Sequence, residues 1–143
     1  MRRNSTSGLF VKMTKKILLV DDSSTSRLAS RMILGQMPDY EVISACDGKE
    51  GVEAALRERP DLILMDIEMP RMTGLEACKV LKQSEATKKI PIVLLTTRGE
   101  KSNVEKGYAN GCSDFLLKPI NEQKLKAVIR VLLGKLEGQK NME

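Results

Sequence analysis

Five short, largely apolar runs recur along the chain. They fall at residues 17–20, 41–46, 62–65, 91–95 and 115–117, and polar or turn-forming residues follow each of them closely. Apolar runs of this length favour β-strands that are buried on both faces. The run Leu62-Ile63-Leu64-Met65 leads directly into Asp66, so we expect this carboxylate at the point where a buried strand leaves the core.

The segments between these runs carry apolar residues at the three- and four-residue spacing of helices. A strand followed by a helix, five times over, predicts a parallel sheet with helices on both faces. We therefore predict one doubly wound α/β domain with a five-stranded parallel sheet and five helices. The inner faces of these helices are predicted to carry Leu28, Met32, Ile33 and Met37; Val52, Ala55 and Leu56; Leu75, Cys78 and Leu81; Val104 and Tyr108; and Leu125, Val128, Ile129 and Leu132.

Two of these helices have features of their own. The fourth, near residues 102–110, has only the weak face of Val104 and Tyr108, so we expect it to be the least firmly packed. The last helix is expected to begin after Asn121 and to end at Gly138.

The net charge of +5 comes from the start of the chain. Residues 1–16 hold five of the 24 basic residues and none of the 19 acidic ones, so the remainder is neutral. A neutral domain with 3% aromatic residues gives no argument for nucleic acid binding. No apolar run approaches the ~20 residues that span a bilayer. We expect residues 1–13 to be a flexible basic extension, added by cloning or by an upstream start, and residues 14–140 to form the domain.

The chain has three cysteines and no histidine. Cys46, Cys78 and Cys112 are odd in number and widely spaced, which favours reduced thiols in the cytoplasm over disulfides or a zinc site. We expect all three to be small core residues. The lack of histidine excludes Ser-His and Cys-His triads, a histidine general base and histidine-ligated metals.

Polar side chains follow four of the predicted strands. Asp21 and Asp22 follow the first strand, Asp66 the third, Thr96 the fourth and Lys118 the fifth. In a parallel sheet these carboxyl ends meet at one edge, where open α/β sheets bind ligands. Asp66 taken alone is equally compatible with a solvated turn. Chance placement explains three acids, a hydroxyl and a lysine at one edge poorly.

Three clustered carboxylates repel one another and require a counter-charge. Without histidine or paired cysteine nearby, the suitable ion is a hard cation bound by oxygen, Mg2+. Carboxylate, Mg2+, lysine and hydroxyl together form a site for a phosphoryl group. A carboxylate can itself accept that group as an aspartyl phosphate. Asp66 is the candidate acceptor, and Asp21 and Asp22 are candidate metal ligands.

Four motifs together resemble the response-regulator receiver domain of the CheY type. They are LLVDDS (18–23), LILMDIEMPRMTG (62–74), IVLLTT (92–97) and LLKP (116–119). Jointly they are highly specific, although each is weak alone, and the resemblance covers about residues 15–136. It implies the sheet order 2-1-3-4-5 that is known for this fold.

The resemblance also implies a role for each residue at this edge. Asp66 would take phosphate from the phosphohistidine of a histidine kinase, and Lys118 would pair with the phosphoryl group. Thr96 would move toward that group, and Phe115 would turn inward into the space that Thr96 leaves. The Lys118-Pro119 peptide bond would be cis. Mg2+ would be held directly by Asp22, Asp66 and the backbone carbonyl of Glu68, with Asp21 acting largely through water.

Two residues beside this edge, Glu68 and Thr97, depart from the family pattern. Glu68, two positions after the acceptor, is often a smaller polar residue, and its carboxylate adds negative charge beside the phosphoryl site. Arg98, two positions after Thr96, is expected to offset that charge, so we predict that Glu68 and Arg98 tune the lifetime of the phosphoryl group. Thr97 is bulkier than the small residue usual there, and we expect it to narrow access for partners.

These features predict a phosphorylation-controlled binding module rather than an enzyme. Its own chemistry would be self-phosphorylation and autodephosphorylation at Asp66. The fourth helix, the fifth strand and the fifth helix would form the face that a partner reads, and this face would also allow a homodimer. The expected partners are a sensor histidine kinase or phosphotransfer protein and an unidentified output partner, without direct binding to nucleic acid or membranes.

Two alternatives belong to other classes. A phosphohydrolase of the haloacid dehalogenase type also uses an aspartate nucleophile and Mg2+, but it carries that aspartate after the first strand in a D-x-D pattern. Here the acceptor follows the third strand. A pseudo-receiver that only docks is the other alternative, and the complete set of acids, lysine and threonine argues against it.

Overall fold

A computed structural model describes residues 14–97 and 99–141, with side chains described through Gly134. The predicted extension over residues 1–13 and the side chain of Arg98 lie outside the described residues. Five strands form one sheet in the order β2-β1-β3-β4-β5, and each neighbouring pair is parallel, which confirms the predicted topology. The strands are β1 (Lys15–Val20), β2 (Tyr40–Ala45), β3 (Leu62–Asp66), β4 (Ile92–Thr96) and β5 (Asp114–Leu117).

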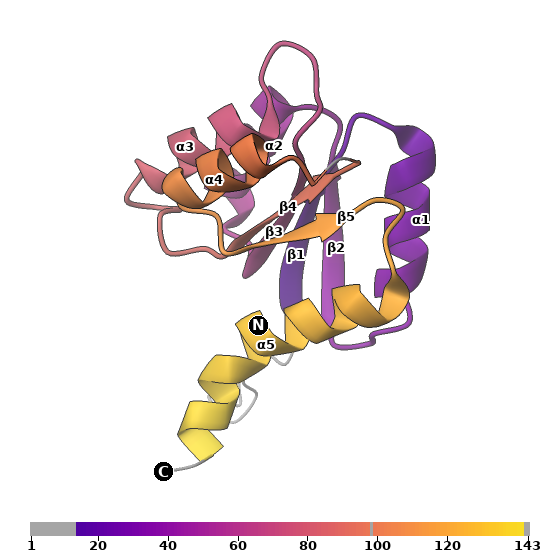
Figure 1. The fold of residues 1–143 in the computed structure, drawn as a ribbon. Coiled ribbons are helices and arrows are strands. Elements are labelled where there is room, and N and C mark those ends of the chain that lie inside the picture. Colours follow the sequence, from indigo (N-terminus) through magenta and orange to yellow (C-terminus); the bar gives the residue numbers. More distant parts are fainter. Residues whose placement is uncertain (1–13, 98, 142–143) are drawn as a thin grey trace.

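Helices cover both faces of this sheet (Figure 1). They are α1 (Ser24–Leu34), α2 (Gly48–Glu58), α3 (Gly74–Lys82), α4 (Lys101–Ala109) and α5 (Glu122–Asn141). One face packs against α1 and α5, and the other against α2, α3 and α4. Within the described part of the chain, no helix is long and apolar enough to cross a membrane.

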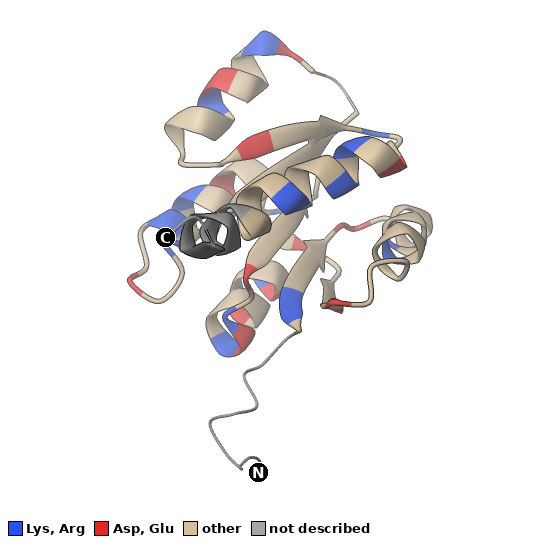
Figure 2. Cartoon of the chain, turned by 90° about the horizontal axis from the view of Figure 1, so that it is seen from below, with Lys and Arg blue, Asp and Glu red and all other residues tan. Residues whose placement is uncertain are grey.

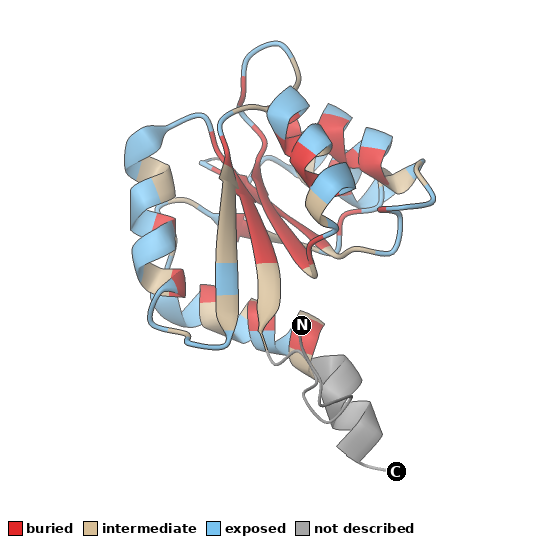
Figure 3. Ribbon diagram, turned by 180° about the vertical axis from the view of Figure 1, so that it is seen from behind, coloured by how far each residue is buried: buried red, intermediate tan, exposed pale blue. Residues whose placement is uncertain are grey.

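The central strand β3 lies between β1 and β4, and all five of its residues are buried (Figure 3). Leu62 and Leu64 face the layer of α1 and α5, whereas Ile63 and Met65 face the opposite layer. This alternation follows from the period of two along a strand, and it confirms that the strand is buried on both faces. Asp66 is its last residue and therefore lies where the strand leaves the core.

The inner face of α1 differs from the predicted one. Leu28 and Met32 are 60% and 65% exposed, and Ser30 is buried instead. The guanidinium of Arg27 donates a hydrogen bond to the backbone carbonyl of Asp21 (2.6 Å), which helps to set the rotation of the helix against the sheet. In that rotation the small Ser30 faces the sheet, and the two larger side chains face solvent.

Two further expectations about helices are wrong. Leu56 of α2 is 43% exposed, because Ala54 and Ala55 make the contact with the core. The last helix does not end at Gly138 but continues to Asn141. A glycine inside a helix costs about 1 kcal/mol relative to alanine, which is too little to end a long helix by itself.

All three cysteines were expected in the core, but they do not share one environment. Cys78 and Cys112 are buried, whereas Cys46 is exposed. The reason is that β2 ends at Ala45, so Cys46 already belongs to the connection that leads into α2.

Helix α4 is weakly attached to the core, as predicted. Gly107 is its one buried residue, and Tyr108 is 49% exposed. The residue before the helix, Glu100, makes no side-chain capping hydrogen bond, whereas α3 begins with a complete capping box at Thr73. A helix with little buried surface and no cap opens at low cost. Over the described residues, basic and acidic residues both occur on most of the helices, in line with the balanced charge of the domain (Figure 2).

Candidate functional site

The carboxyl ends of four strands bring the predicted site residues together at one edge of the sheet. Asp21 follows β1 and Asp66 ends β3, and these two strands are hydrogen-bonded neighbours. Thr96 ends β4, and its carbonyl accepts a hydrogen bond from the amide of Lys118, which follows β5 (2.8 Å). Asp21, Asp66 and Thr96 are no more than 3% exposed. The convergence predicted from the strand ends is therefore present.

Three carboxylates cluster at this edge. Asp21, Asp22 and Asp66 each offer an oxygen atom, and these atoms lie within 4.8 Å of one another. Two of the acids are oriented by the backbone that follows them. The amide of Ser23 donates to Asp21 Oδ1 (3.0 Å), and the amide of Glu68 donates to Asp66 Oδ1 (3.3 Å). Because Asp21 and Asp66 are buried, their mutual repulsion is weakly screened and requires a nearby cation.

Lys118 supplies one such cation. Its ammonium lies 2.9 Å from Asp21 Oδ2 and 3.1 Å from Asp66 Oδ2, and its side chain is 12% exposed. Burial alone would lower the pKa of Lys118, but the contacts and charges of the two acids outweigh burial and raise it. The peptide bond to Pro119 is cis, as expected.

The two buried acids titrate differently. Burial raises the pKa of Asp66 to about 6; the ammonium of Lys118 opposes this rise, and the charge of Asp21 adds to it. Burial also acts to raise the pKa of Asp21, but hydrogen bonds from Ser26, Lys118 and the Ser23 amide hold it below its usual value. Strongly perturbed acids at a ligand-binding edge are typical of functional sites.

The donor set fits a hard divalent cation. All three cluster members are carboxylates, which Mg2+ prefers over nitrogen and sulfur ligands. Oδ2 of Asp21 is buried without a hydrogen bond of good geometry, although the ammonium of Lys118 is near it, so this oxygen retains capacity for a ligand. Asp22 is exposed and leaves the cluster open to solvent.

Gly74 is a site residue that the sequence reasoning did not identify as such. A Cβ atom there would collide with the carbonyl oxygen of Asp66 and would lie 2.9 Å from the Cα of Ile67. The amide of Gly74 donates to the carbonyl of Ile67 (3.0 Å). The connection from β3 to α3 therefore folds back directly onto the acceptor candidate, which requires glycine. A glycine at the start of a helix, soon after a strand-end acid, is the available sequence signal.

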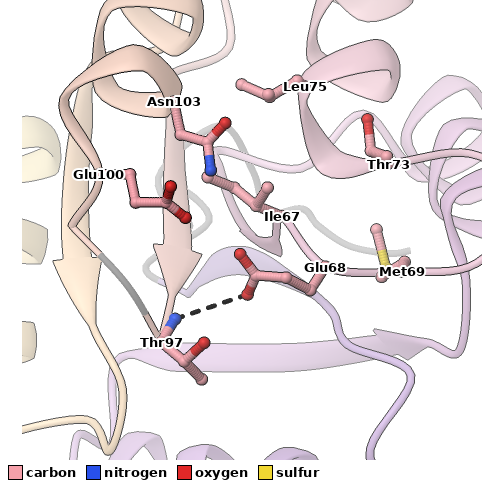
Figure 4. Close-up of a pocket in the computed structure, with 8 residues that line it drawn as sticks. All are labelled: Ile67, Glu68, Met69, Thr73, Leu75, Thr97, Glu100 and Asn103. Atoms are coloured by element: carbon pink, nitrogen blue, oxygen red, sulfur yellow. Dashed lines mark hydrogen bonds between the residues drawn. The ribbon is translucent and has the colours of Figure 1, made fainter.

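Glu68 reaches across the site to the end of β4. The hydroxyl of Thr96 donates to Glu68 Oε2 (3.0 Å), and the amide of Thr97 donates to Glu68 Oε1 (3.5 Å). Glu68 and Thr97 line a pocket of about 440 Å3 between the β3–α3 connection and the start of α4 (Figure 4). The predicted counter-charge, Arg98, lies outside the described side chains, so its pairing with Glu68 stays a prediction.

Phe115, the expected switch residue, is half-buried in β5 beneath α4. Its ring packs against Tyr108 with centroids 5.3 Å apart and an interplanar angle of 59°. A Cβ atom at Gly107 would collide with the Phe115 ring, so α4 approaches β5 closely at this point. The pair of Tyr108 and Phe115 therefore connects the weakly packed helix α4 with β5, the strand that leads to Lys118.

A family model for the response regulator receiver domain matches residues 17–130. The chain belongs to this family. All the motifs and site residues described above lie within the matched receiver domain. Receiver domains of this family are phosphoacceptors in two-component signalling rather than enzymes in their own right.

Three relatives differ in how much of their own length this chain covers. Protein PilH of Pseudomonas aeruginosa is 35% identical over 119 residues, which cover 83% of this chain and 98% of PilH. The alkaline phosphatase synthesis transcriptional regulatory protein PhoP of Bacillus subtilis is 34% identical over 125 residues, or 87% of this chain and 51% of PhoP. The chain thus spans about half of PhoP, and 26% of the response regulator PleD of Caulobacter vibrioides.

Solved structures agree with this assignment. The chemotaxis response regulator CheY4 of Vibrio cholerae is 36% identical, with a TM-score of 0.77 over 84% of this chain and 99% of that chain. The receiver domain of the sensor histidine kinase PA1611 of Pseudomonas aeruginosa is 29% identical, with a TM-score of 0.78 over 85% of this chain and 98% of that chain. That receiver was solved with a magnesium ion coordinated in its active site cleft.

Proposed function

We propose that this receiver domain accepts a phosphoryl group on Asp66 from the phosphohistidine of a sensor histidine kinase or phosphotransfer protein. The observation that carries the proposal is the position of Lys118, whose ammonium contacts both Asp66 and Asp21 inside a cluster of three acids. A partly buried lysine at this place neutralises the resting acids and offers a charge partner to the oxygens of a phosphoryl group on Asp66.

Phosphoryl transfer from the phosphohistidine to Asp66 is balanced and needs no further reactant. A carboxylate oxygen of Asp66 attacks phosphorus, the P–N bond of the phosphohistidine breaks, and the histidine nitrogen leaves with the electron pair. The product is an acyl phosphate on Asp66. Water later attacks phosphorus and releases inorganic phosphate, which restores the carboxylate. Because Asp66 must be ionised to attack, its contact with Lys118 supports the reactive form.

Mg2+ is the proposed cofactor, with Asp22, Asp66 and the Glu68 carbonyl as direct ligands and Asp21 acting largely through water. When bound, the ion supplies positive charge for the phosphoryl oxygens. The buried, incompletely hydrogen-bonded oxygen of Asp21 and the all-carboxylate cluster support this assignment.

The proposed output is a change in partner binding through α4, β5 and α5. Thr96 would shift toward the phosphoryl group, and Phe115 would turn inward beneath the loosely packed α4. Among the described side chains, each of the three elements exposes a large apolar residue suited to an interface, namely Tyr108, Leu117 and Val131, and β5 is an edge strand. The same face would allow a homodimer. We also propose that the chain works in the cytoplasm.

Incubation with acetyl phosphate and Mg2+, followed by intact-mass measurement, tests this function. We expect wild type to gain one phosphoryl group and Asp66→Asn to gain none. Asp39→Asn, which changes an exposed acid before β2, is the matched control and should gain the group as wild type does. An adduct that persists in Asp66→Asn would overturn the assignment. Steady turnover of phosphate monoesters would instead favour the alternative hypothesis of a haloacid-dehalogenase-type phosphohydrolase.

A further inference from the structure

The side chain of Glu68 holds two hydrogen-bond donors at the end of β4. One is the hydroxyl of Thr96, which is 1% exposed, and the other is the amide of Thr97. The backbone amide of Glu68 meanwhile donates to Asp66 Oδ1 (3.3 Å). Glu68 therefore contacts the candidate acceptor Asp66 through its backbone amide, and it contacts the end of β4 through its side-chain carboxylate.

A carboxylate and a phosphoryl group accept hydrogen bonds from the same donors. Both are anions whose oxygens pair with hydroxyl and amide groups. A phosphoryl group on Asp66 would add three acceptor oxygens within reach of β4. It would also add negative charge beside Glu68, and the repulsion between two neighbouring anions favours their separation.

The surroundings of Glu68 permit such a separation. Glu68 is exposed, whereas Thr96 is buried, so the carboxylate can leave the contact and become solvated while the hydroxyl stays inside. The pocket of about 440 Å3 that Glu68 lines provides room for this movement (Figure 4).

We infer that the Glu68 side chain is a latch that competes with the phosphoryl group for the Thr96 hydroxyl and the Thr97 amide. In the unphosphorylated chain the latch is closed and holds Thr96 in its resting position. Phosphorylation opens it, because the phosphoryl group takes the donors and repels the carboxylate. The inference rests on the proposed role of Asp66, and it makes Glu68 a positioning residue for the switch rather than a ligand of the phosphoryl group.

The latch has a consequence for the resting chain. A ligand shifts a two-state equilibrium only by its differential affinity for the two states, so an internal competitor lowers the apparent affinity of the site for a phosphoryl group. Removal of the Glu68 carboxylate should therefore end the competition for the Thr96 hydroxyl and tighten the binding of a phosphoryl analogue.

Two measurements on the full chain test this inference. The first is NMR of the Thr96 side-chain rotamer and the Thr97 amide shift, without Mg2+ or phosphodonor. The second is a titration with beryllium fluoride, a tetrahedral phosphoryl analogue, in the presence of Mg2+. The variants are Glu68→Ala and Glu68→Gln. The matched controls are Glu100→Ala and Glu100→Gln, since Glu100 lines the same pocket and its side chain caps no helix.

We expect Glu68→Ala to change the rotamer populations of Thr96, to shift the Thr97 amide and to bind beryllium fluoride about 3- to 10-fold more tightly, in line with the loss of one competing hydrogen-bonded contact. Glu68→Gln keeps an acceptor oxygen and should fall between wild type and Glu68→Ala. The Glu100 variants should leave the Thr96 rotamer unchanged and tighten binding less.

Three results would overturn the latch: an unchanged Thr96 rotamer in Glu68→Ala, weaker beryllium fluoride binding by that variant, or equal gains from Glu100→Ala. The last result would assign the effect to pocket charge alone. Failure of wild type to bind beryllium fluoride would instead count against the proposed function of Asp66. The metal-free NMR comparison separates that outcome from an absent contact between Glu68 and Thr96.

Discussion

The ammonium of Lys118 lies 3.1 Å from Oδ2 of Asp66, although 52 positions separate the two residues in the chain. The contact forms because both residues stand at carboxyl ends of strands in one parallel sheet. Lys118 also contacts Asp21, so a single partly buried cation serves two acids. A divalent ion at the same acids would have to share the site with that cation.

We predict that Lys118→Met binds Mg2+ more tightly than wild type, by about tenfold, because the ammonium repels a second cation at the acid cluster. Isothermal titration calorimetry is the suitable measurement, since the chain has no tryptophan to report binding by fluorescence. Lys126→Met is the matched control, because Lys126 pairs with Glu122 on α5, outside the acid cluster. Equal or weaker Mg2+ binding by Lys118→Met would contradict the predicted competition.

The buried carboxylate of Asp66 should cost stability in the metal-free protein. Its pKa is raised to about 6 in the folded chain, from an ordinary value of 3.8, chiefly by burial. The folded chain therefore holds a proton that the unfolded chain has lost between these two values, and stability falls as the pH rises through that window. Above the folded pKa the cost is complete, and we expect about 1–3 kcal/mol.

Asp66→Asn removes this cost and should be more stable than wild type at pH 7.5 in EDTA. The gain should shrink as the pH falls below 6 and should vanish near the unfolded pKa. Urea unfolding at several pH values measures the difference. Asp39→Asn, at an exposed acid, is the matched control. A gain for Asp66→Asn that is constant with pH would show that the Asp66 carboxylate does not titrate in this way.

The parallel sheet and the edge that carries the site were predictable from the pattern alone, whereas the strand order came from the resemblance to the receiver family. Strand runs and crossover helices determine a parallel sheet, and a parallel sheet places all carboxyl ends together. The residues that follow those ends could then be taken directly from the sequence. Asp21, Asp66, Thr96 and Lys118 meet in the structure for that reason.

The details that escaped prediction depend on individual side-chain contacts. The rotation of α1 involves one hydrogen bond from Arg27 to a backbone carbonyl, and an apolar spacing cannot reveal it. The contacts of the Glu68 carboxylate with Thr96 and Thr97 were not predicted either. The direction of a loop side chain has no periodicity from which it could have been predicted.

Gly74 provides a test of how closely the β3–α3 connection is packed. We predict that Gly74→Ala lowers the free energy of unfolding by about 1–3 kcal/mol, because the new Cβ would collide with the backbone of Asp66 rather than with a movable side chain. Gly134→Ala in α5 is the matched control. A Cβ there meets nothing within 4 Å, so it should stabilise by about 0.5–1 kcal/mol. Similar effects of both substitutions in chemical denaturation would argue against the close approach at Gly74.

The three thiols should differ sharply in reactivity. Cys46 is exposed, whereas burial raises the pKa of Cys78 to about 11 and that of Cys112 to about 12. The thiolate is the reactive form, so both buried cysteines are protected by their protonation as well as by their lack of access. We predict that a disulfide reagent such as DTNB titrates one thiol rapidly in the native chain at pH 8, and all three after denaturation. Cys46→Ser should abolish the rapid phase, and a rapid phase that survives in this variant would show that a thiol in the core is accessible.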